Sequence, residues 1–306
     1  MKFPISPDSN IAIAPPSGIG DALMFMTLAF QFHKNGNNVT LFNSALTSLQ
    51  SWFPHVKILP TPDQDKILNT LTNFDFTIVG DHSFAEPFEK KLPNCTVLKK
   101  KLFNRNKTIA ENLIDCGKKL FKLQILNANN GITPPDNSLT HRKYQTRVII
   151  HTMSADPLKN WPAKKFITLA KKLKQAGYYP VFITSPNERA EWEIHLQGQF
   201  ELPLFPSLDK LARFIFESGW MIGNDSGIGH LASNLGIPTL SLFRVKSKSQ
   251  LWRPSWSYGM VVTPWLRIPG PHFRNLWKTF LTVNQVFNAF NRLVFTFKTR
   301  GNNHAK

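Results

Sequence analysis

The sequence predicts an α/β protein built as two halves, in which short apolar strands alternate with helices. The clearest unit spans residues 220–243. A short apolar strand at 220–222 ends in a polar, glycine-rich turn, and a helix over 227–235 follows it. Gly236 suits the C-cap of that helix, and the apolar run at 239–243 suits the next strand. This strand–turn–helix–strand order is typical of an α/β domain.

The first half shows the same alternation of apolar runs and longer segments. The elements expected there are strands at 11–14, 39–42, 56–59 and 76–79 and helices at 22–32 and 63–71. The helix at 22–32 is apolar on most faces, so we expect it to be buried. Prolines, glycines and Asp21 interrupt the apolar run at 11–30, which therefore does not predict a membrane span.

The second half is expected to begin after a polar stretch that is rich in asparagine and contains glycine and proline. Its predicted elements are strands at 147–151 and 179–183 and helices at 163–175, from 188, at 208–217 and at 281–293. A chain of 306 residues allows two domains of typical size. We therefore expect an N-terminal domain at 1–130, a linker at 131–146, and a C-terminal domain at 147–306 with a closing helix and a loose basic tail.

The charge balance is strongly basic. Lys and Arg number 37 against 19 Asp and Glu, which gives a formal net charge of +18. A field of this size favours an anionic partner, either nucleic acid, an anionic membrane surface, or a phosphorylated or acidic substrate. The 42% hydrophobic content is enough for a sizeable core and excludes a disordered chain.

The cysteines and the N-terminus bear on the cellular compartment. Only Cys95 and Cys116 are present, so the sequence has no disulfide framework, and it has no Cys/His spacing typical of a metal site. A reducing compartment is the simpler interpretation. The first ten residues lack the apolar core of a signal peptide. We expect a cytoplasmic protein that is held at a membrane face by charge.

The turn at 223–230 has the chemistry of a phosphate site. Asp225 and Ser226 are favourable N-cap residues, while Gly227 and Gly229 let a ligand approach the backbone. Free N–H groups and the positive end of the helix dipole would then face the ligand. The alternative is an ordinary capped helix after a tight turn.

Asp21 holds a comparable position in the first half. It ends the glycine-bearing loop at 15–21, at the carboxyl end of the first strand and the start of the apolar helix. Ligands of open α/β sheets bind at that edge. The alternative is a simple N-cap. Asp81 and His82 follow another strand in the same way and are further candidates for substrate contact, with ordinary loop polarity as the alternative.

Two further polar patterns are present in the first half. A basic stretch predicts either a platform for anionic lipid or substrate or a solvated helix face; it contains Lys99, Lys100, Lys101, Arg105, Lys107, Lys118, Lys119 and Lys122. Asp63-Gln64-Asp65 matches the D-x-D pair with which some transferases bind a metal. It follows two prolines in an expected surface loop, so we predict no metal site there.

Taken together, the motifs resemble those of glycosyltransferase family 9, the ADP-heptose:lipopolysaccharide heptosyltransferases. The matching segments are SGIGD near the N-terminus, LKNWPAKKFITLAKKL at 158–173, SPNER at 185–189, GNDSGIGHLASNLGIPTLSLF at 223–243 and the closing LTVNQVFNAFNRL. Each motif is weak by itself, but their order and spacing cover most of the chain.

The resemblance implies a GT-B fold, with two Rossmann-like domains and a cleft between them. It also implies inverting, metal-independent transfer of a heptose from ADP-heptose to the inner core of lipopolysaccharide, with no cofactor. The N-terminal domain would bind the acceptor, and the C-terminal domain the nucleotide sugar. The implied location is the cytoplasmic face of the inner membrane of a Gram-negative bacterium, where the enzyme would meet an anionic glycolipid.

The resemblance also assigns roles to individual residues. Asp21 resembles the family's catalytic base, in a loop whose Ser17, Gly18 and Gly20 would lie beside the acceptor. Lys159 resembles the lysine that contacts the donor diphosphate, and Glu188 the acid that holds the ribose hydroxyls. The remaining donor residues implied are Ser154, Asp225, Ser226, Gly227 and His230. Without the family pattern, Lys159 would be read as a surface lysine and His230 as a packed helix histidine.

The chain departs from the family pattern in two places. The family usually continues its last motif as LF-Gly-x-Thr, whereas this chain has Leu242-Phe243-Arg244-Val245-Lys246. Pro15 and Pro16 precede Gly18 where a basic residue is common. A related sugar and a weakened enzyme therefore stay open.

Two other functions remain as alternatives. The basic charge would also suit a nucleic-acid-binding protein, although the sequence has no RRM, KH or zinc-finger signature. A non-catalytic relative that binds only the nucleotide is the other alternative.

Overall fold

The structure is a computed structural model that describes residues 5–303 except 82–85, 267, 269 and 271–273. The chain forms two compact units, Met1–Asn137 and Ser138–Lys306. Their boundary falls within the expected linker at 131–146. None of the helices in the described ranges is both long enough and apolar enough to cross a membrane.

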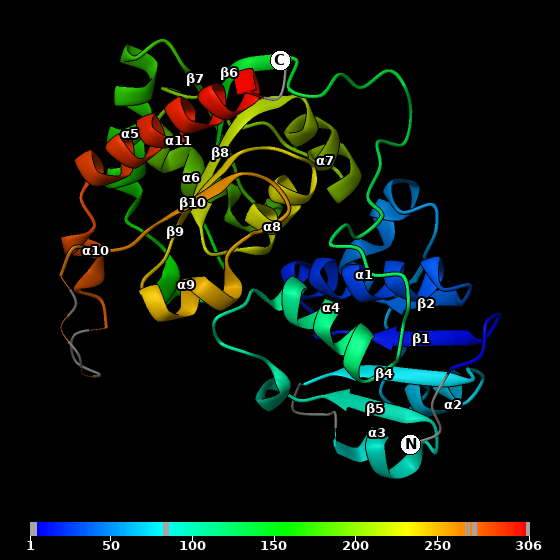
Figure 1. Ribbon diagram of the computed structural model, residues 1–306. Helices are drawn as coiled ribbons and strands as arrows, with labels where there is room; N and C mark the ends of the chain where they lie inside the picture. The colour runs from blue at the N-terminus through cyan, green and yellow to red at the C-terminus, as the bar shows by residue number, and fades with distance from the viewer. Residues whose placement is uncertain (1–4, 82–85, 267, 269, 271–273, 304–306) are drawn as a thin grey trace. The chain divides into compact units, whose positions relative to one another are not determined.

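The first unit is built on a parallel five-stranded sheet with the order β3-β2-β1-β4-β5 (Figure 1). Its strands are β1 Asn10–Ala14, β2 Asn38–Phe42, β3 Lys57–Leu59, β4 Phe76–Gly80 and β5 Cys95–Leu98. The central strand β1 is buried from Ile11 to Ala14, as an apolar run covered on both faces requires. The order reverses direction between β1 and β4, so ligands are expected beyond the carboxyl ends of these two strands.

Along the chain, helices alternate with most of the strands of the first unit. They are α1 Ile19–Lys34, α2 Ile67–Leu71, α3 Glu86–Lys91 and α4 Ile109–Lys119, with short 3-10 helices η1 Ser44–Trp52 and η2 Lys100–Leu102. Helix α1 is buried continuously from Ala22 to Phe32, as its apolar sequence predicts. It packs against α4, whose start is fixed by a capping box between Thr108 and Glu111.

The second unit repeats this plan with a parallel sheet in the order β10-β9-β8-β6-β7. Its strands are β6 Tyr144–His151, β7 Tyr179–Ile183, β8 Ser218–Asn224, β9 Thr239–Leu242 and β10 Gly259–Val262. All of β8 is buried, and the change of direction falls between β6 and β8. The carboxyl ends of β6 and β8 are therefore the expected ligand edge of this unit.

Helices enclose the second sheet and contribute a core rich in aromatic side chains. They are α5 Ala163–Gln175, α6 Arg189–Leu196, α7 Leu208–Phe216, α8 Gly227–Asn234, α9 Lys246–Trp252, α10 Trp277–Phe280 and α11 Val283–Asn303, with 3-10 helices η3 Pro157–Lys159 and η4 Pro186–Glu188. Helix α11, red in Figure 1, packs beside α5 and reaches β9 and β10. It buries Val286, Ala289, Phe290 and Leu293 in the core.

Several expected elements differ in extent. The helix expected at 63–71 is confined to α2 at Ile67–Leu71. After β9 the chain forms α9, where the sequence predicted no element, and the closing helix runs to Asn303, so most of the expected loose tail is helical. The strand expected at 147–151 begins earlier, at Tyr144. These differences change the ends of elements and leave the edge that carries the candidate residues intact.

Candidate functional site

The side chain of Asn224 connects the ends of β6 and β8. Asn224 is the last residue of β8 and is 1% exposed. Its Nδ2 donates to the backbone carbonyl of Thr152, just beyond β6. Its Oδ1 accepts from the backbone N–H of Trp161 at 3.2 Å. Both ends of the loop at 152–161 are therefore attached to the point where β8 turns into α8.

Lys159 lies in this loop and reaches the turn after β8. Its Nζ forms an ion pair with Asp225 Oδ2 at 2.7 Å, with the lysine side chain 36% exposed and the aspartate 14% exposed. Asp156 caps the short helix η3 that carries Lys159 by accepting from Leu158 N at 3.0 Å. The structure thus places Lys159 and Asp225 in one site, although 66 positions separate them in the sequence.

Helix α10 and Leu281, which follows it, form hydrogen bonds with the same loop. The indole Nε1 of Trp277 donates to the carbonyl of Leu158 at 3.0 Å, and Lys278 Nζ donates to that of Pro157 at 3.2 Å. Trp161 Nε1 in turn donates to the carbonyl of Leu281 at 3.0 Å. These contacts fix the backbone beside Lys159. No sequence motif predicts these contacts, because the partners lie more than a hundred residues apart.

Ser226 is the N-cap of α8, as the turn chemistry predicts. Its Oγ accepts from Gly229 N at 3.5 Å and lies 3.1 Å from Nδ1 of His151, at the end of β6. Gly227 opens the helix, so its first N–H groups and the positive end of its dipole lie at the carboxyl edge of the sheet. Phosphate or carboxylate groups are the ligands that such a site favours.

Two buried histidines surround this turn. Burial lowers the pKa of His151 to about 4, although the charge of Glu188 opposes that change. Burial, and next the positive charge of Lys159, lowers the pKa of His230 to about 4. Both imidazoles are therefore neutral at pH 7. The Nδ1 atom of His230 is buried and has no hydrogen-bond partner among the described residues, which marks a polar group available to a ligand.

Glu188 and Ser154 have local roles in the structure. Glu188 Oε2 accepts from Ser185 N at 2.9 Å, in a capping box that starts the helical segment after β7. The Ser154 hydroxyl lies 3.0 Å from both the Asp156 carbonyl and Asn160 Oδ1, so it stabilises the loop that carries Lys159. The effect of Glu188 on the pKa of His151 places its charge near the β6 end of the site. His151 itself could have been found from its place at a predicted strand end.

Asp21 lies in the first turn of α1, at the carboxyl edge of the first sheet. A Cβ added at Gly18 would lie 2.8 Å from Asp21 Oδ2, so the carboxylate lies close to the backbone at the start of the helix. Asn43 Nδ2 fixes the preceding loop by donating to the carbonyls of Pro16 and Ser17 at 3.4 and 3.3 Å. Ser17 and Gly18 are exposed, and Gly20 is half-buried. The N-cap of α1 is Gly18, so the N-cap interpretation of Asp21 is wrong: Asp21 is the third residue of the helix and an acidic residue of its first turn.

The other acidic candidates of this unit are engaged or remote. Asp81 Oδ2 accepts from Lys100 N at 2.9 Å, which gives it a structural role, and His82 lies outside the described residues. Asp63 and Asp65 are exposed, and Asp63 pairs with Lys66 at 3.4 Å. Over the part of the chain that the structure describes, no group of three or more His, Cys, Asp or Glu side chains is arranged to hold a metal ion.

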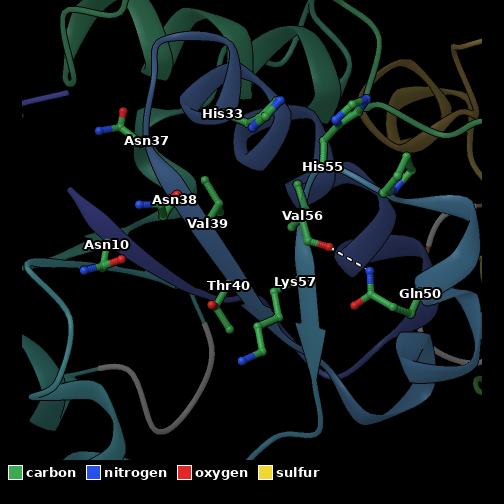
Figure 2. A pocket seen from close by; sticks show the side chains of 11 residues that line it. Asn10, His33, Asn37, Asn38, Val39, Thr40, Gln50, His55, Val56 and Lys57 are labelled. Atoms are coloured by element: carbon green, nitrogen blue, oxygen red, sulfur yellow. Dashed lines mark hydrogen bonds between the residues drawn. The ribbon is translucent and has the colours of Figure 1, made fainter. Parts of the chain in front are cut away.

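A cavity of about 610 Å³ is present in the first unit, but it lies at the opposite end of the strands (Figure 2). Asn10, Asn38 and Lys57, which line it, are the first residues of β1, β2 and β3. His33 and His55 also line it, with ring centroids 4.8 Å apart. Asp21 follows the carboxyl end of β1, so this cavity is separate from the Asp21 edge.

The structure has two doubly wound parallel sheets, and at the carboxyl edge of the second sheet lies a helix N-terminus that suits an anion. This is the architecture of the GT-B fold, which the chain shares with similar solved structures. The family model of glycosyltransferase family 9 (heptosyltransferase) matches residues 97–263. The chain belongs to this family, and the protein is therefore a glycosyltransferase. The resemblance seen in the sequence motifs is confirmed, and so is the implied GT-B fold class with two parallel-sheet α/β domains.

Solved structures with this fold cover nearly the whole chain. A glycosyl transferase family 9 protein from Veillonella parvula is 17% identical, with a TM-score of 0.72 over 96% of this chain and 100% of its own. The E. coli ADP-heptose LPS heptosyltransferase II is 19% identical, with a TM-score of 0.69 over 94% and 99%. The iron-containing dodecameric glycosyltransferase TibC of enterotoxigenic E. coli is 15% identical, with a TM-score of 0.64 over 96% and 78%. A search of curated protein sequences found no match.

The two buried histidines predict a loss of stability in acid. Because the pKa of each is lowered on folding, their contribution to stability is complete above pH 6.5 and is lost as the pH falls toward 4. Urea unfolding at pH 7.5 and pH 5 should show a free energy of unfolding lower at pH 5 by roughly 1–2 kcal/mol for each histidine. His151→Asn should reduce this difference, whereas His195→Asn, at an exposed position, should not. An equal difference in all three proteins would contradict the assignment.

Proposed function

We propose that the protein is an inverting glycosyltransferase that transfers a heptose, or a related sugar, from an ADP-sugar to a lipopolysaccharide inner-core acceptor. The observation that carries this proposal is the convergence of Lys159, Asp225, Ser226 and His230 at the N-terminus of α8. The family membership supports the reaction class. The similar structure described as an ADP-heptose LPS heptosyltransferase supports the choice of donor and acceptor.

The donor diphosphate would bind at the start of α8. The helix dipole carries about half a positive charge there, and Gly227 lets the phosphate reach the backbone N–H groups. Lys159 would exchange its ion pair with Asp225 for a phosphate oxygen, since its side chain is already partly exposed. The unpartnered Nδ1 of His230 is a further polar atom beside this position.

Glu188 would bind the ribose of the nucleotide. It lies at the start of the helical segment after β7, and β7 pairs with β6 along the same parallel sheet. An ionised carboxylate has more acceptor sites than its bond to Ser185 N uses, so it can also accept from ribose hydroxyls. The charge that Glu188 exerts on His151 supports this placement near the donor edge.

Asp21 would act as the general base. The acceptor hydroxyl attacks the anomeric carbon, its proton passes to the Asp21 carboxylate, and the bond from that carbon to the diphosphate breaks to release ADP. Attack opposite the leaving group inverts the anomeric centre. The α1 dipole favours the ionised form of Asp21, as a base requires.

The proposed reaction uses no metal ion. Positive charge at the diphosphate comes from Lys159 and the α8 N-terminus, which is the kind of stabilisation that a departing diphosphate needs. The D-x-D pair at Asp63 and Asp65 is exposed in a loop before α2. TibC is described as iron-containing, so the metal requirement of this protein has to be measured directly.

We further propose that the protein acts at the cytoplasmic face of an anionic membrane, where the glycolipid acceptor would lie. The basic residues of the first unit form two groups near opposite ends of α4. Lys100, Lys101 and Arg105 precede the helix, while Lys118, Lys119 and Lys122 lie at or beyond its end, and all six are exposed. Lys99 and Lys107 pair with Glu89 and Asp115, so they contribute less net charge. The surface is therefore two patches on this unit.

The donor assignment predicts stabilisation by ADP. At about a hundredfold excess over its dissociation constant, a ligand adds roughly 2.7 kcal/mol to the free energy of unfolding, which a thermal-shift assay detects. ADP and ADP-heptose should raise the melting temperature, and Lys159→Ala should reduce the effect. Lys164→Ala, on α5, is the control and should not. A response to UDP or GDP sugars with none to ADP would show that the donor is wrong.

The base assignment predicts that Asp21→Asn loses turnover by at least about a hundredfold, because general-base catalysis typically contributes 10²–10⁴-fold. Donor binding and the melting temperature should be retained. Normal turnover would leave Asp21 with only its favourable position in the first turn of α1, and unfolding would make it structural.

The metal-free mechanism predicts that transfer by the wild type persists in EDTA. Strict dependence on a divalent metal would contradict it.

The membrane proposal predicts salt-dependent binding to anionic vesicles. Each Lys or Arg near the surface contributes about 1 kcal/mol, and screening reduces this at higher ionic strength. A triple change of Lys118, Lys119 and Lys122 to Gln should weaken co-sedimentation. The control is a triple change of Lys171, Lys172 and Lys174 on α5 in the other unit. Equal binding to neutral vesicles would contradict the proposal, and binding only to RNA or DNA would favour a nucleic-acid function.

A further inference from the structure

Arg244 follows the carboxyl end of β9, the strand beside β8. The Asp225 N–H donates to the carbonyl of Leu242, the last residue of β9, at 3.2 Å. The Phe243 N–H donates to Val262 on β10 at 3.0 Å, which fixes the backbone immediately before Arg244. Arg244 therefore emerges from the same sheet edge as the turn that carries Asp225 and Ser226.

The guanidinium of Arg244 is partly buried without a matching acceptor. Arg244 is half-buried, unlike Lys246, Ser247 and Lys248, which are exposed. Its Nη1 atom is buried and has no hydrogen-bond partner within the described ranges. Arg244 is therefore less exposed than the basic residues that follow it in the sequence. A buried donor of a charged group normally has an acceptor, so this position points to a group that binds there.

Other buried nitrogen atoms without partners among the described residues occur in the segments around α8. They are Nδ1 of His230 and the indole Nε1 of Trp256, and the two rings lie 6.1 Å apart. The loop that carries Trp256 is attached to α8, because Ser233 Oγ accepts from the backbone N–H of Trp256 at 3.1 Å. The indole N–H of Trp256 is a donor, whereas Nδ1 of the neutral His230 donates or accepts according to its tautomer. Such buried polar atoms thus recur beside this helix, as expected where a polar ligand is to bind.

The charge of the donor edge also calls for another cation. Lys159 and Asp225 carry opposite charges, so the two residues together add no net charge to this edge, even when Lys159 binds a phosphate oxygen. The α8 N-terminus then supplies only about half a positive charge. A diphosphate is negatively charged on both phosphates, and its negative charge increases as it leaves the sugar. Arg244 would supply a full positive charge from the β9 side, where no ion pair to it is found among the described residues.

We propose that Arg244 is a donor-binding residue whose guanidinium binds the diphosphate of the nucleotide sugar. This rests on the proposed function and extends it to a residue outside the family motif. The planar guanidinium donates two parallel hydrogen bonds to phosphate oxygens, which lysine does not. Its contribution grows as the diphosphate departs, so Arg244 both holds the donor and stabilises the leaving group.

The test is calorimetric titration of the full-length protein with ADP, pyrophosphate and adenosine. Arg244→Gln should weaken ADP and pyrophosphate binding by about tenfold or more and leave adenosine binding unchanged. Arg244→Lys keeps the charge but loses the paired geometry, so its affinity for ADP should fall between those of the wild type and Arg244→Gln. The matched controls Lys246→Gln and Lys248→Gln, both at exposed positions, should bind all three ligands as the wild type does.

The outcomes separate this inference from the function on which it rests. If the wild type binds ADP, Lys159→Ala weakens that binding and Arg244→Gln does not, the role of Arg244 is wrong while the donor site stands. If the wild type binds neither ADP nor pyrophosphate, the donor site and the inference both fail. If Arg244→Gln does not fold, Arg244→Lys decides: unchanged affinity for ADP and pyrophosphate overturns the two-bond geometry. An equal loss in the Lys246→Gln control would reduce the effect to general electrostatics and overturn the assignment.

Discussion

Asn224 forms the connection on which the geometry of the donor edge depends. Its amide binds a carbonyl after β6 and its oxygen binds a backbone N–H at Trp161, so one buried side chain holds both ends of the loop that carries Lys159. The residue after it is Asp225, the partner of Lys159. A buried amide with both ends bonded is stable, whereas loss of one partner leaves an unsatisfied group at a cost of about 1–3 kcal/mol. The position of Lys159 relative to α8 therefore depends on the two hydrogen bonds of Asn224, the last residue of β8.

The sheet order determines where these residues meet. In each unit the first strand, β1 or β6, lies inside the sheet with a neighbour on each side, so the chain continues to one side and later returns to the other. The loops after β1 and β6 therefore stand beside the loops after β4 and β8, with α1 starting after β1 and α8 after β8. The apolar strands are buried and supply stability, while the polar residues at their carboxyl ends remain available for substrates. The same plan provides the proposed base in one unit and the proposed anion site in the other.

Much of this arrangement could be predicted from the sequence. Strand β7 and helix α5 match their expected limits, because apolar runs and an amphipathic pattern define them clearly. The N-cap role of Ser226 followed from residue type. Short elements were missed: β5, with four residues, lies in a basic stretch, and α9 is rich in lysine and serine without an apolar stripe. Contacts such as Trp277 to Leu158 could not be predicted, because nothing local to either residue encodes the partner.

A co-crystal structure with ADP tests the central claim most directly, namely that the β6–β8 edge binds the donor nucleotide. The account predicts diphosphate density at the N-terminus of α8, with Lys159 Nζ moved from Asp225 to a phosphate oxygen at about 2.7–2.9 Å, the distance of a charge-assisted hydrogen bond. ADP bound in the cavity lined by His33 and His55, with the Lys159–Asp225 pair intact, would contradict it.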